Sequence, residues 1–481
     1  MDIIPWTESQ FWLNAFHWGW PILLYAFGLI AAIDAIWNGR TSQGTLAWVT
    51  ALTFIPFIAL PLYLFFGSRK FHGYKKARKV GKQALRLVNL QQNFSNQTAT
   101  HLKKSDKKSN LVLPLEALSR LPQSEQNQVQ LLINGEQTFA HIFQAIETAQ
   151  SSILVQFYII NDDQLGRRLQ QALINKAQQG VKVYLLYDEI GSSNLKQQFI
   201  NELRLHDVHC SRFNRFQFMR RLQINFRNHR KLIIIDGKTC FIGGHNIGDE
   251  YLRQDSELGI WRDTHLQIDG PASMASQLSF VEDWYWAQKK IPSLNWQPHT
   301  SNDNTKVLIV PGGPADDIET MSLSFVHLIQ QAQHSIWLAT PYFIPDLKVM
   351  GALQLAALKG LEIRILLPEQ TDNRLIAWAT RSYVNELRQL GIEFFQYQAG
   401  FMHQKVMLID QELSYIGSAN LDNRSLRINF ELNALIESEE FAKQVRQMLI
   451  EDFEHSRPFP QSGGVLTQLA TKAARLLSPI L

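Results

Sequence analysis

The sequence predicts two similar α/β domains that follow an N-terminal pair of membrane helices. Three observations support this fold class. A stretch that begins at His229 recurs 174 positions later at His403, helix-then-strand patterns repeat in both halves of the chain, and two long apolar runs precede both halves. With 481 residues, the chain is long enough for two or three domains with complete hydrophobic cores.

Residues 16–37 and 45–67 form the two apolar runs. The first has Asp34 as its one charged residue, and the second has none. Each run is long enough to cross the hydrocarbon core of a bilayer, so we expect a transmembrane hairpin within residues 1–67. A cleaved signal peptide is the alternative, but the first 15 residues carry two acidic residues and no basic ones, and a second apolar run follows.

The distribution of basic residues predicts the orientation of this hairpin. The loop at 38–44 carries one arginine, whereas residues 68–82 carry seven lysines and arginines. Because basic residues favour the cytoplasmic side, we expect the loop outside and the C-terminal part of a multi-pass protein in the cytoplasm. Residues 68–128 then form a basic and polar linker between the membrane and the globular part.

The globular part is predicted to consist of two halves, 129–300 and 301–481. The segment HIFQAIETAQSSILVQFYII from His141 matches FVHLIQQAQHSIWLATPYFI from Phe325. In both, an apolar-periodic helix precedes a short β-branched run, which predicts strand–helix alternation and a largely parallel sheet. A polar, proline-containing stretch at 289–306 marks the boundary between the halves.

The repeated stretch contains residue types that carry chemistry. The candidate site residues are His229, Lys231, Asp236, Asn246 and Glu257 in the first copy, and His403, Lys405, Asp410, Asn420 and Glu431 in the second. One His-x-Lys-x4-Asp pattern would be weak evidence, but two copies with the same downstream spacing are not expected by chance. Strand periodicity places each histidine and lysine on one face, so both can address one ligand.

These residue types suit transfer at a phosphodiester. Two lysines and two asparagine amides can bind non-bridging oxygens, and no acidic cluster for a divalent cation lies near them, so we expect no metal and no other cofactor. Of two histidines, one can attack phosphorus while the other protonates the leaving alkoxide and then deprotonates an incoming alcohol.

The acidic residues are assigned different roles. Glu257 and Glu431 are predicted to hold and orient the imidazoles. Asp236 and Asp410 stand at the far ends of their strands, so we expect them to be mainly structural.

Three further features leave alternatives open. The segment 212–230 alternates phenylalanines with arginines, and it is either a surface loop whose rings pack on the domain or a lip that inserts into lipid. The same pattern could bind single-stranded nucleic acid, but two membrane helices favour lipid. The segment 464–481 is amphipathic and is expected to pack on the core rather than on the membrane. Cys210 and Cys240 are too few for a disulfide framework.

The paired His-Lys-Asp motif resembles that of the phospholipase D superfamily, and nearly the whole chain resembles its bacterial cardiolipin synthases. Matching segments are WRDTHLQIDGPA from Trp261, TPYFIPD from Thr340 and GSANLDNRSLRINFELN from Gly417. The resemblance implies two phospholipase D-like α/β domains with a shared pseudo-symmetric site, and it places both His-Lys-Asp sets in the active site without metal. It also implies condensation of two phosphatidylglycerols to cardiolipin and glycerol, through a phosphatidyl-histidine, at the bacterial inner membrane.

The residues alone leave other functions open. A hydrolase would use water as the acceptor on the same scaffold, and a nuclease is disfavoured by the membrane hairpin. A scaffold that binds anionic membrane lipid would leave both intact motifs unused. We expect phosphatidylglycerol and anionic lipid as partners, and no nucleic acid. His229 is assigned as the nucleophile and His403 as the general acid and then base, because the first motif usually attacks in this superfamily.

Overall fold

The computed structural model forms two compact units. One comprises residues 1–72 with 216–225, and the other comprises residues 73–215 with 226–481. The residues that the structure describes are 8–39, 42–67, 74, 77–79, 110–213, 225–252, 259–297, 299–371, 373–461, 464–476 and 478.

The first predicted membrane helix is present, but the second is not a single helix. Helix α1 spans Glu8–Asn38, and within it Gly19–Asn38 is the one described segment long and apolar enough to cross a membrane. The second apolar run divides into α2 (Ser42–Phe54) and α3 (Pro56–Phe66). Because Pro56 has no N–H, it cannot continue the hydrogen-bond ladder of α2, but it can begin a new helix.

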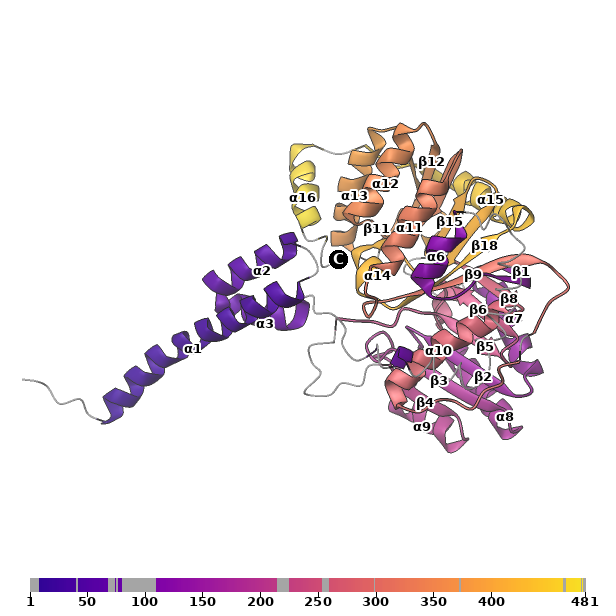
Figure 1. The fold of residues 1–481 in the computed structure, drawn as a ribbon, viewed down its shortest axis with the longest axis horizontal. Helices are drawn as coiled ribbons and strands as arrows, with labels where there is room; N and C mark the ends of the chain where they lie inside the picture. The colour runs from indigo at the N-terminus through magenta and orange to yellow at the C-terminus, as the bar shows by residue number, and fades with distance from the viewer. Residues whose placement is uncertain are drawn as a thin grey trace, which may run out of the picture. The chain divides into compact units, whose positions relative to one another are not determined.

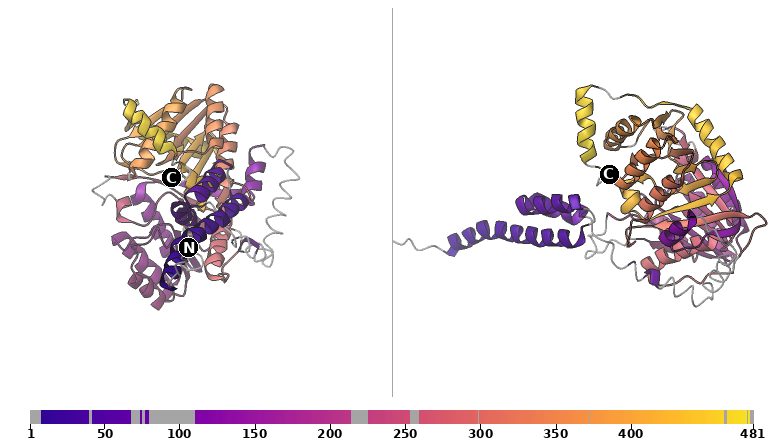
Figure 2. Two further views of the ribbon diagram at one scale, coloured as in Figure 1. Left: turned by 90° about the vertical axis from the view of Figure 1, so that its left-hand side faces the viewer. Right: turned by 45° about the horizontal axis from the view of Figure 1, so that its top comes forward.

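Helices α2 and α3 pack against each other as a helical hairpin beside α1 (Figures 1 and 2). The ring of Trp48 in α2 lies 5.2 Å from the ring of Tyr63 in α3, whereas one continuous helix would separate them by about 22 Å. The hydroxyl of Tyr63 donates to Asp34 of α1 at 2.8 Å, while Leu52, near the turn, packs against Gly28 in the middle of α1. Helix α3 therefore returns toward the C-terminal end of α1.

Within the described part of the chain, a sheet of 15 strands runs through both α/β halves (Figure 1). The strands of the first half are β1 (Ser124–Ile133), β2 (Ser152–Phe157), β3 (Lys182–Tyr187), β4 (His209–Arg212), β5 (Leu232–Ile235), β6 (Thr239–Gly243) and β8 (Thr264–Asp269). The strands of the second half are β9 (Thr305–Gly312), β10 (Ser335–Ala339), β12 (Glu362–Pro368), β13 (Glu393–Tyr397), β15 (Val406–Ile409), β16 (Leu413–Gly417), β18 (Glu431–Glu437) and β19 (Ser456–Pro458). Two short parallel pairs lie outside this sheet, β11 (Phe343–Ile344) with β17 (Leu421–Asp422) and β7 (Trp261–Arg262) with β14 (Phe401–Met402).

The two halves share one strand plan and meet where β1 pairs with β9. Outward from this pair, the order β8-β6-β5-β2-β3-β4 in the first half matches β18-β16-β15-β10-β12-β13 in the second. The prediction of a largely parallel sheet is wrong. Among the described strands of the main sheet, parallel pairing is confined to β2-β3-β4 and β10-β12-β13, because tight turns rather than crossover helices connect strands such as β5 and β6.

Helices cover the sheet, and each half has its own hydrophobic core. The helices are α6 (Val112–Ser119), α7 (Asn134–Thr148), α8 (Gln164–Gln178), α9 (Gln197–Leu205), α10 (Ala272–Gln288), α11 (Thr320–Gln331), α12 (Leu347–Leu358), α13 (Arg374–Arg388), α14 (Asn423–Arg427), α15 (Glu439–Glu454) and α16 (Val465–Leu476), with a short 3-10 turn at Asp249–Leu252. Helix α10 is buried on almost every side. The prediction that the C-terminal segment packs on the core is confirmed, since Ala474 of α16 belongs to the core of the second half.

Candidate active site

The two histidines of the repeat lie at the junction of the halves, and a carboxylate of the opposite half holds each one. Nδ1 of His229 lies 3.0 Å from Oε2 of Glu431. Nδ1 of His403 lies 2.7 Å from Oδ2 of Asp263. Both carboxylates are fully buried. Each half therefore supplies one imidazole and the carboxylate that orients the other imidazole.

The backbone repeats this exchange between the halves. The N–H of His229 donates to the carbonyl of Phe430 at 2.9 Å, and the N–H of His403 donates to the carbonyl of Arg262 at 2.8 Å. Phe430 and Arg262 directly precede the two carboxylates. Each histidine is thus fixed at both its backbone and its ring by the same short segment of the opposite half.

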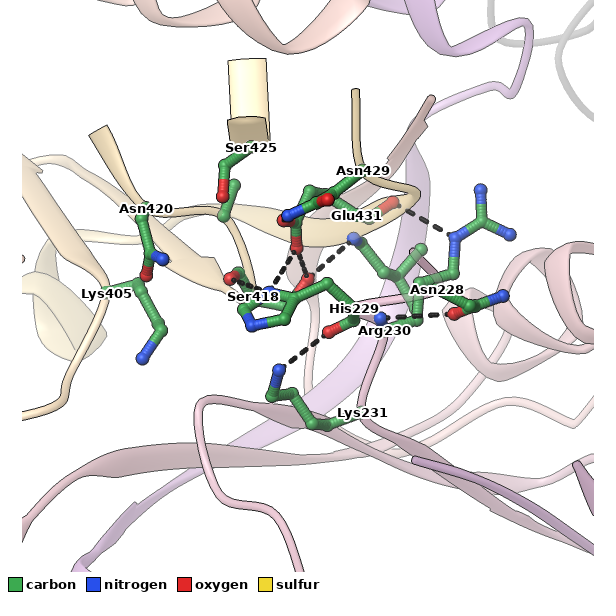
Figure 3. Close-up of polar contacts among 12 residues, drawn as sticks. Asn228, His229, Arg230, Lys231, Lys405, Ser418, Asn420, Ser425, Asn429 and Glu431 are labelled. Atoms are coloured by element: carbon green, nitrogen blue, oxygen red, sulfur yellow. Dashed lines mark hydrogen bonds and ion pairs between the residues drawn. The ribbon is translucent and has the colours of Figure 1, made fainter. Parts of the chain in front are cut away.

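The surroundings of Glu431 keep its carboxylate ionised while it binds His229. Its Oε2 also accepts from the Ser418 hydroxyl at 2.5 Å, and its Oε1 lies 3.4 Å from the Asn429 amide (Figure 3). Burial alone would raise the pKa of Glu431, but the neighbouring His229 and Lys231 lower it below its usual value. An ionised carboxylate accepts a hydrogen bond from a protonated Nδ1, which leaves Nε2 of His229 with its lone pair.

Burial also keeps the His229 ring neutral. It lowers the pKa of His229, Glu431 opposes that shift, and the ammonium of Lys231 lowers the pKa again. A neutral imidazole with Nδ1 bound to a carboxylate is a nucleophile at Nε2.

The two lysines of the repeat are buried beside the histidines. Nζ of Lys231 donates to the carbonyl of His229 at 2.8 Å. Nζ of Lys405 lies 3.0 Å from Nδ1 of His403. Burial, with a further contribution from Lys405, lowers the pKa of Lys231 to about 7. Two partly desolvated ammonium groups at one point form a strong site for an anion such as a phosphodiester.

His403 has the more strongly perturbed ring. Burial lowers its pKa well below the usual value, and the ammonium groups of Lys405 and Lys231 lower it further. The Tyr251 hydroxyl lies 3.4 Å from the same Nδ1 that Asp263 binds. Negative charge beside this ring would reverse the effect of the lysines, so an anionic substrate favours its protonated form.

The structure places Asp236 and Asp410 away from the imidazoles, at the opposite ends of their strands. Asp236 accepts from the backbone N–H groups of residues 150–152 at 2.7–2.9 Å, and Asp410 accepts from those of residues 333–335 at 2.8–3.0 Å. Both adopt a left-handed backbone with φ of 55° and 53°. They fix the turn that follows each strand, which agrees with the expected structural role. Among the described residues no contact joins either carboxylate to the imidazoles, so the place in the active site that the resemblance implies stays a prediction.

The two asparagines are buried near the site but already have protein partners. The Asn246 amide donates to the Tyr251 hydroxyl at 3.3 Å, and its oxygen accepts from the N–H of Ile159 at 3.2 Å. The Asn420 amide donates to Asp422 at 3.2 Å. Asn246 thus contacts the ring system around His403 through Tyr251, and the amide nitrogen of each asparagine donates to a protein acceptor.

The sequence did not identify Asp263 as a functional residue. Glu257, which was predicted for this position, lies outside the described residues. Strand β8 begins at Thr264 and strand β18 begins at Glu431. Thr264 corresponds to Leu432, because their carbonyls accept from the equivalent residues Gly244 and Ser418. These two positions are 168 residues apart rather than 174. Asp263 and Glu431 are therefore equivalent, and the first half has six extra residues before its strand. The signal was the acidic residue directly before an apolar strand, as in RDTHLQID and NFELNALIE.

Three other expectations concern the predicted lip, metal binding and the two cysteines. Residues 214–224 of the predicted lip lie outside the described residues, whereas Phe213 and Phe226 at its ends are buried, and Phe213 packs on Phe430 at 5.0 Å. Within the described ranges, no group of three or more His, Cys, Asp or Glu side chains could hold a metal ion. Cys210 and Cys240 are both free and buried.

Comparison with known proteins gives consistent matches over almost the whole chain. The family described as "Cardiolipin synthase, PLD-like domain" matches residues 142–273 and 325–453, and the one described as "Phospholipase_D-nuclease N-terminal" matches residues 26–68. Cardiolipin synthase A from Pseudomonas putida is 45% identical over 466 residues, which cover 95% of this chain and 97% of that protein. Cardiolipin synthase A from Pseudomonas entomophila is 43% identical over 465 residues, with the same coverage.

Among solved structures, phosphatidylserine synthase from Haemophilus influenzae is similar with a TM-score of 0.58 and 16% identity, and the match covers 77% of this chain and all of that one. At this identity the similarity concerns the fold alone.

Both matching α/β halves fall within the PLD-like family match, and each half supplies the carboxylate that binds the histidine of the other half. This fold and this shared site define a phospholipase D-type protein. The sequence matches narrow this class. The chain belongs to the bacterial cardiolipin synthase family of the phospholipase D superfamily.

Proposed function

We propose that the protein is a membrane-bound phosphatidyltransferase that condenses two phosphatidylglycerol molecules to cardiolipin and glycerol. The observation that carries this proposal is the pair of imidazoles, each held at Nδ1 by a carboxylate of the opposite half, with two buried lysines beside them. This arrangement supplies a nucleophile, a general acid and base, and a site for the charge of the phosphodiester.

In the first half-reaction, Nε2 of His229 attacks the phosphorus of one phosphatidylglycerol. The N–P bond forms, the bond from phosphorus to the glycerol head-group oxygen breaks, and the leaving alkoxide takes a proton from His403. Glu431 stabilises the charge that develops on the His229 ring. Lys231 and Lys405 compensate the charge of the non-bridging oxygens.

In the second half-reaction, neutral His403 removes a proton from a head-group hydroxyl of another phosphatidylglycerol. The resulting alkoxide attacks phosphorus, the N–P bond breaks, and His229 is restored. Protons and charge balance over the cycle, and the products are cardiolipin and glycerol. Because burial and the neighbouring lysines lower the pKa of His403, the negative charge of the bound substrate is needed to raise that pKa, so that His403 carries a proton for the first step.

Reconstitution in liposomes that contain labelled phosphatidylglycerol tests this function. Resolution of the products by mass should show cardiolipin and glycerol in equal amounts. Phosphatidic acid as the main product would instead identify a hydrolase, in which water is the acceptor, and unchanged lipid would favour a non-enzymatic lipid-binding role.

For the membrane part, we propose that α1 alone crosses the bacterial inner membrane and that α2 and α3 enter and leave it on the cytoplasmic side. The contact between Tyr63 and Asp34 supports this arrangement, because it returns α3 to the end of α1 from which the chain departs. The basic residues agree with it. Arg40 and the seven basic residues of 68–82 then share the cytoplasmic side, while the N-terminus, which has acidic residues only, lies outside.

Cysteine labelling distinguishes this topology from two complete crossings. An impermeant thiol reagent should label Ser9→Cys in cells with a permeable outer membrane, but label Ser42→Cys and Ser105→Cys only after lysis. Two crossings require the reverse result at Ser9 and Ser42. The native cysteines are buried in the α/β unit and give little background.

A further inference from the structure

A buried carboxylate, Asp283 of helix α10, supports the backbone that carries His229. Its Oδ2 accepts from the side chains of both residues that flank His229, at 2.8 Å from Asn228 and at 2.8 Å from Arg230. Gln156 donates to the same oxygen at 2.6 Å. Asp283, Asn228 and Arg230 are all buried, so these bonds form in a region of low dielectric constant, where each one is strong.

Arg230 also connects this carboxylate to the group that orients the ring of His229. Its Nε donates to the carbonyl of Glu431 at 3.1 Å (Figure 3), and a second nitrogen lies 3.4 Å from the carbonyl of Gly312. A shift of Asp283 would therefore move both the backbone of His229 and the strand that begins with Glu431.

The remaining oxygen of Asp283 accepts a hydrogen bond from Tyr74. Tyr74 follows Phe66, the last residue of α3, by only eight positions, yet its side chain is fully buried in the α/β unit. Its ring packs on Phe430 at 4.9 Å, and the carbonyl of Phe430 binds the N–H of His229. Burial and the charge of Asp283 raise the pKa of Tyr74 well above its usual value, so the phenol remains a donor.

Arg78 lies four residues after Tyr74 in the segment that follows α3, which we call the juxtamembrane segment (described at residues 74 and 77–79). Its guanidinium forms ion pairs with Asp316 at 2.5 Å and with Glu282 at 3.6 Å. Glu282 is the neighbour of Asp283 on α10. Two side chains of the juxtamembrane segment, Tyr74 and Arg78, are thus held at adjacent positions of the helix that supports the site.

We infer that Tyr74 is a positioning residue for His229: the juxtamembrane segment completes the catalytic centre by holding Asp283, and through it Asn228 and Arg230. This inference rests on the proposed function, in which His229 is the nucleophile. Removal of the Tyr74 hydroxyl leaves one oxygen of a buried carboxylate without this donor, and the carboxylate and its partners must rearrange. Misplacement of a nucleophile by about 1 Å can lower a rate by about 100-fold.

The test uses the full-length protein in detergent and a phosphatidyl ester of p-nitrophenol as the donor, without an acceptor alcohol. The amplitude of the p-nitrophenolate burst counts competent sites, and its rate reports attack by His229. In Tyr74→Phe, we expect the wild-type amplitude and a burst rate lowered by about 10- to 100-fold. The control is Tyr184→Phe, because the ring of Tyr184 packs on Trp284 of the same helix, α10, at 5.1 Å, and this variant should keep both values.

The outcomes separate this inference from the proposed function. A wild-type protein without a burst would refute the proposed function and this inference with it. A normal wild-type burst with an unchanged rate in Tyr74→Phe, or with only a smaller amplitude, would overturn the inference alone, because loss of folded protein lowers the amplitude and not the rate. If Tyr74→Phe does not fold, Gln156→Met provides the test, because it removes another donor to Asp283. A slower burst in Gln156→Met would support the positioning of His229 through Asp283, and a wild-type burst rate would refute it.

Discussion

Replacement of Glu431 by glutamine tests the central feature of the site, because it keeps the shape of the side chain and removes its charge. Oε2 of Glu431 accepts from both His229 and Ser418, while Oε1 faces the Asn429 amide. If the new amide nitrogen faces His229, it donates to Nδ1 and moves the ring proton to Nε2, the attacking atom. If the amide oxygen faces His229, the new NH2 group meets the Asn429 donor, and the ring loses its anionic partner.

Both arrangements weaken the nucleophile, and the expected loss in kcat is about 10²- to 10⁴-fold, which corresponds to about 2.7–5.4 kcal/mol of transition-state stabilisation. The KM for phosphatidylglycerol should change little, because the lysines that face the phosphodiester are untouched. The melting temperature should also stay near the wild-type value, since the size and most of the hydrogen bonds of the side chain are retained.

The assay is cardiolipin formation in phosphatidylglycerol liposomes, measured by mass against the amount of folded enzyme. Glu437→Gln is the matched control, because Glu437 ends the same strand and contacts Lys306 at 3.2 Å, away from the histidines. Wild-type kcat in a folded Glu431→Gln protein would refute the role of Glu431 as the group that orients His229.

Three further changes test the other parts of the site. Asp263→Asn should lower kcat by about 10²- to 10⁴-fold with phosphatidylglycerol, but it should leave the p-nitrophenolate burst almost unchanged, since that leaving group needs no proton; an equal loss with both donors would contradict the assignment of His403 as general acid. Because the pKa of Lys231 is about 7 in the folded protein, kcat/KM should fall as pH rises above about 7, and Lys231→Arg, which stays charged, should lose this alkaline limb if it folds. Because the pKa of Lys231 is lower in the folded than in the unfolded protein, the buried ammonium lowers the free energy of unfolding below about pH 7, and this loss shrinks as pH rises toward the pKa of the unfolded state. A wild-type melting temperature that falls relative to that of Lys231→Met between about pH 7 and 9 would contradict the low pKa of Lys231. Asp236→Asn should lower the free energy of unfolding by about 1–3 kcal/mol and leave kcat per folded site near the wild-type value, which denaturant unfolding and active-site counting can check.

The sequence could predict features that depend on local spacing. The close spacing of His229 and Lys231 directly before a buried strand, and the position of Asp236 at the turn directly after it, could be predicted from the sequence, although both His229 and Lys231 precede β5 rather than lie on it. The exchange of carboxylates between the halves could not be predicted in this way, because Glu431 and His229 are 202 positions apart. Asp263 was missed because a constant spacing of 174 was extended through a loop whose length differs between the halves.

Two errors in the predicted fold have similar physical causes. Strand–helix alternation is real around β2 and β3, but it was extended to strands that tight turns connect, and these are antiparallel. Hydropathy could not detect the turn between α2 and α3, because apolar residues surround it on both sides. The run contains two prolines, and Pro56 begins α3 whereas Pro61 lies inside that helix, so proline alone did not mark the break.

Under the proposed function, the exchange of carboxylates makes the β1–β9 junction part of the catalytic machinery. Neither half contains both a histidine and the carboxylate that binds it, so a small rotation of one half against the other would separate both imidazoles from their carboxylates at once. One distortion of this junction would therefore impair both chemical steps. The two carboxylates also differ, since an aspartate binds His403 and a glutamate binds His229. Because both copies lie in one polypeptide, the pKa of each imidazole can be set by a different residue.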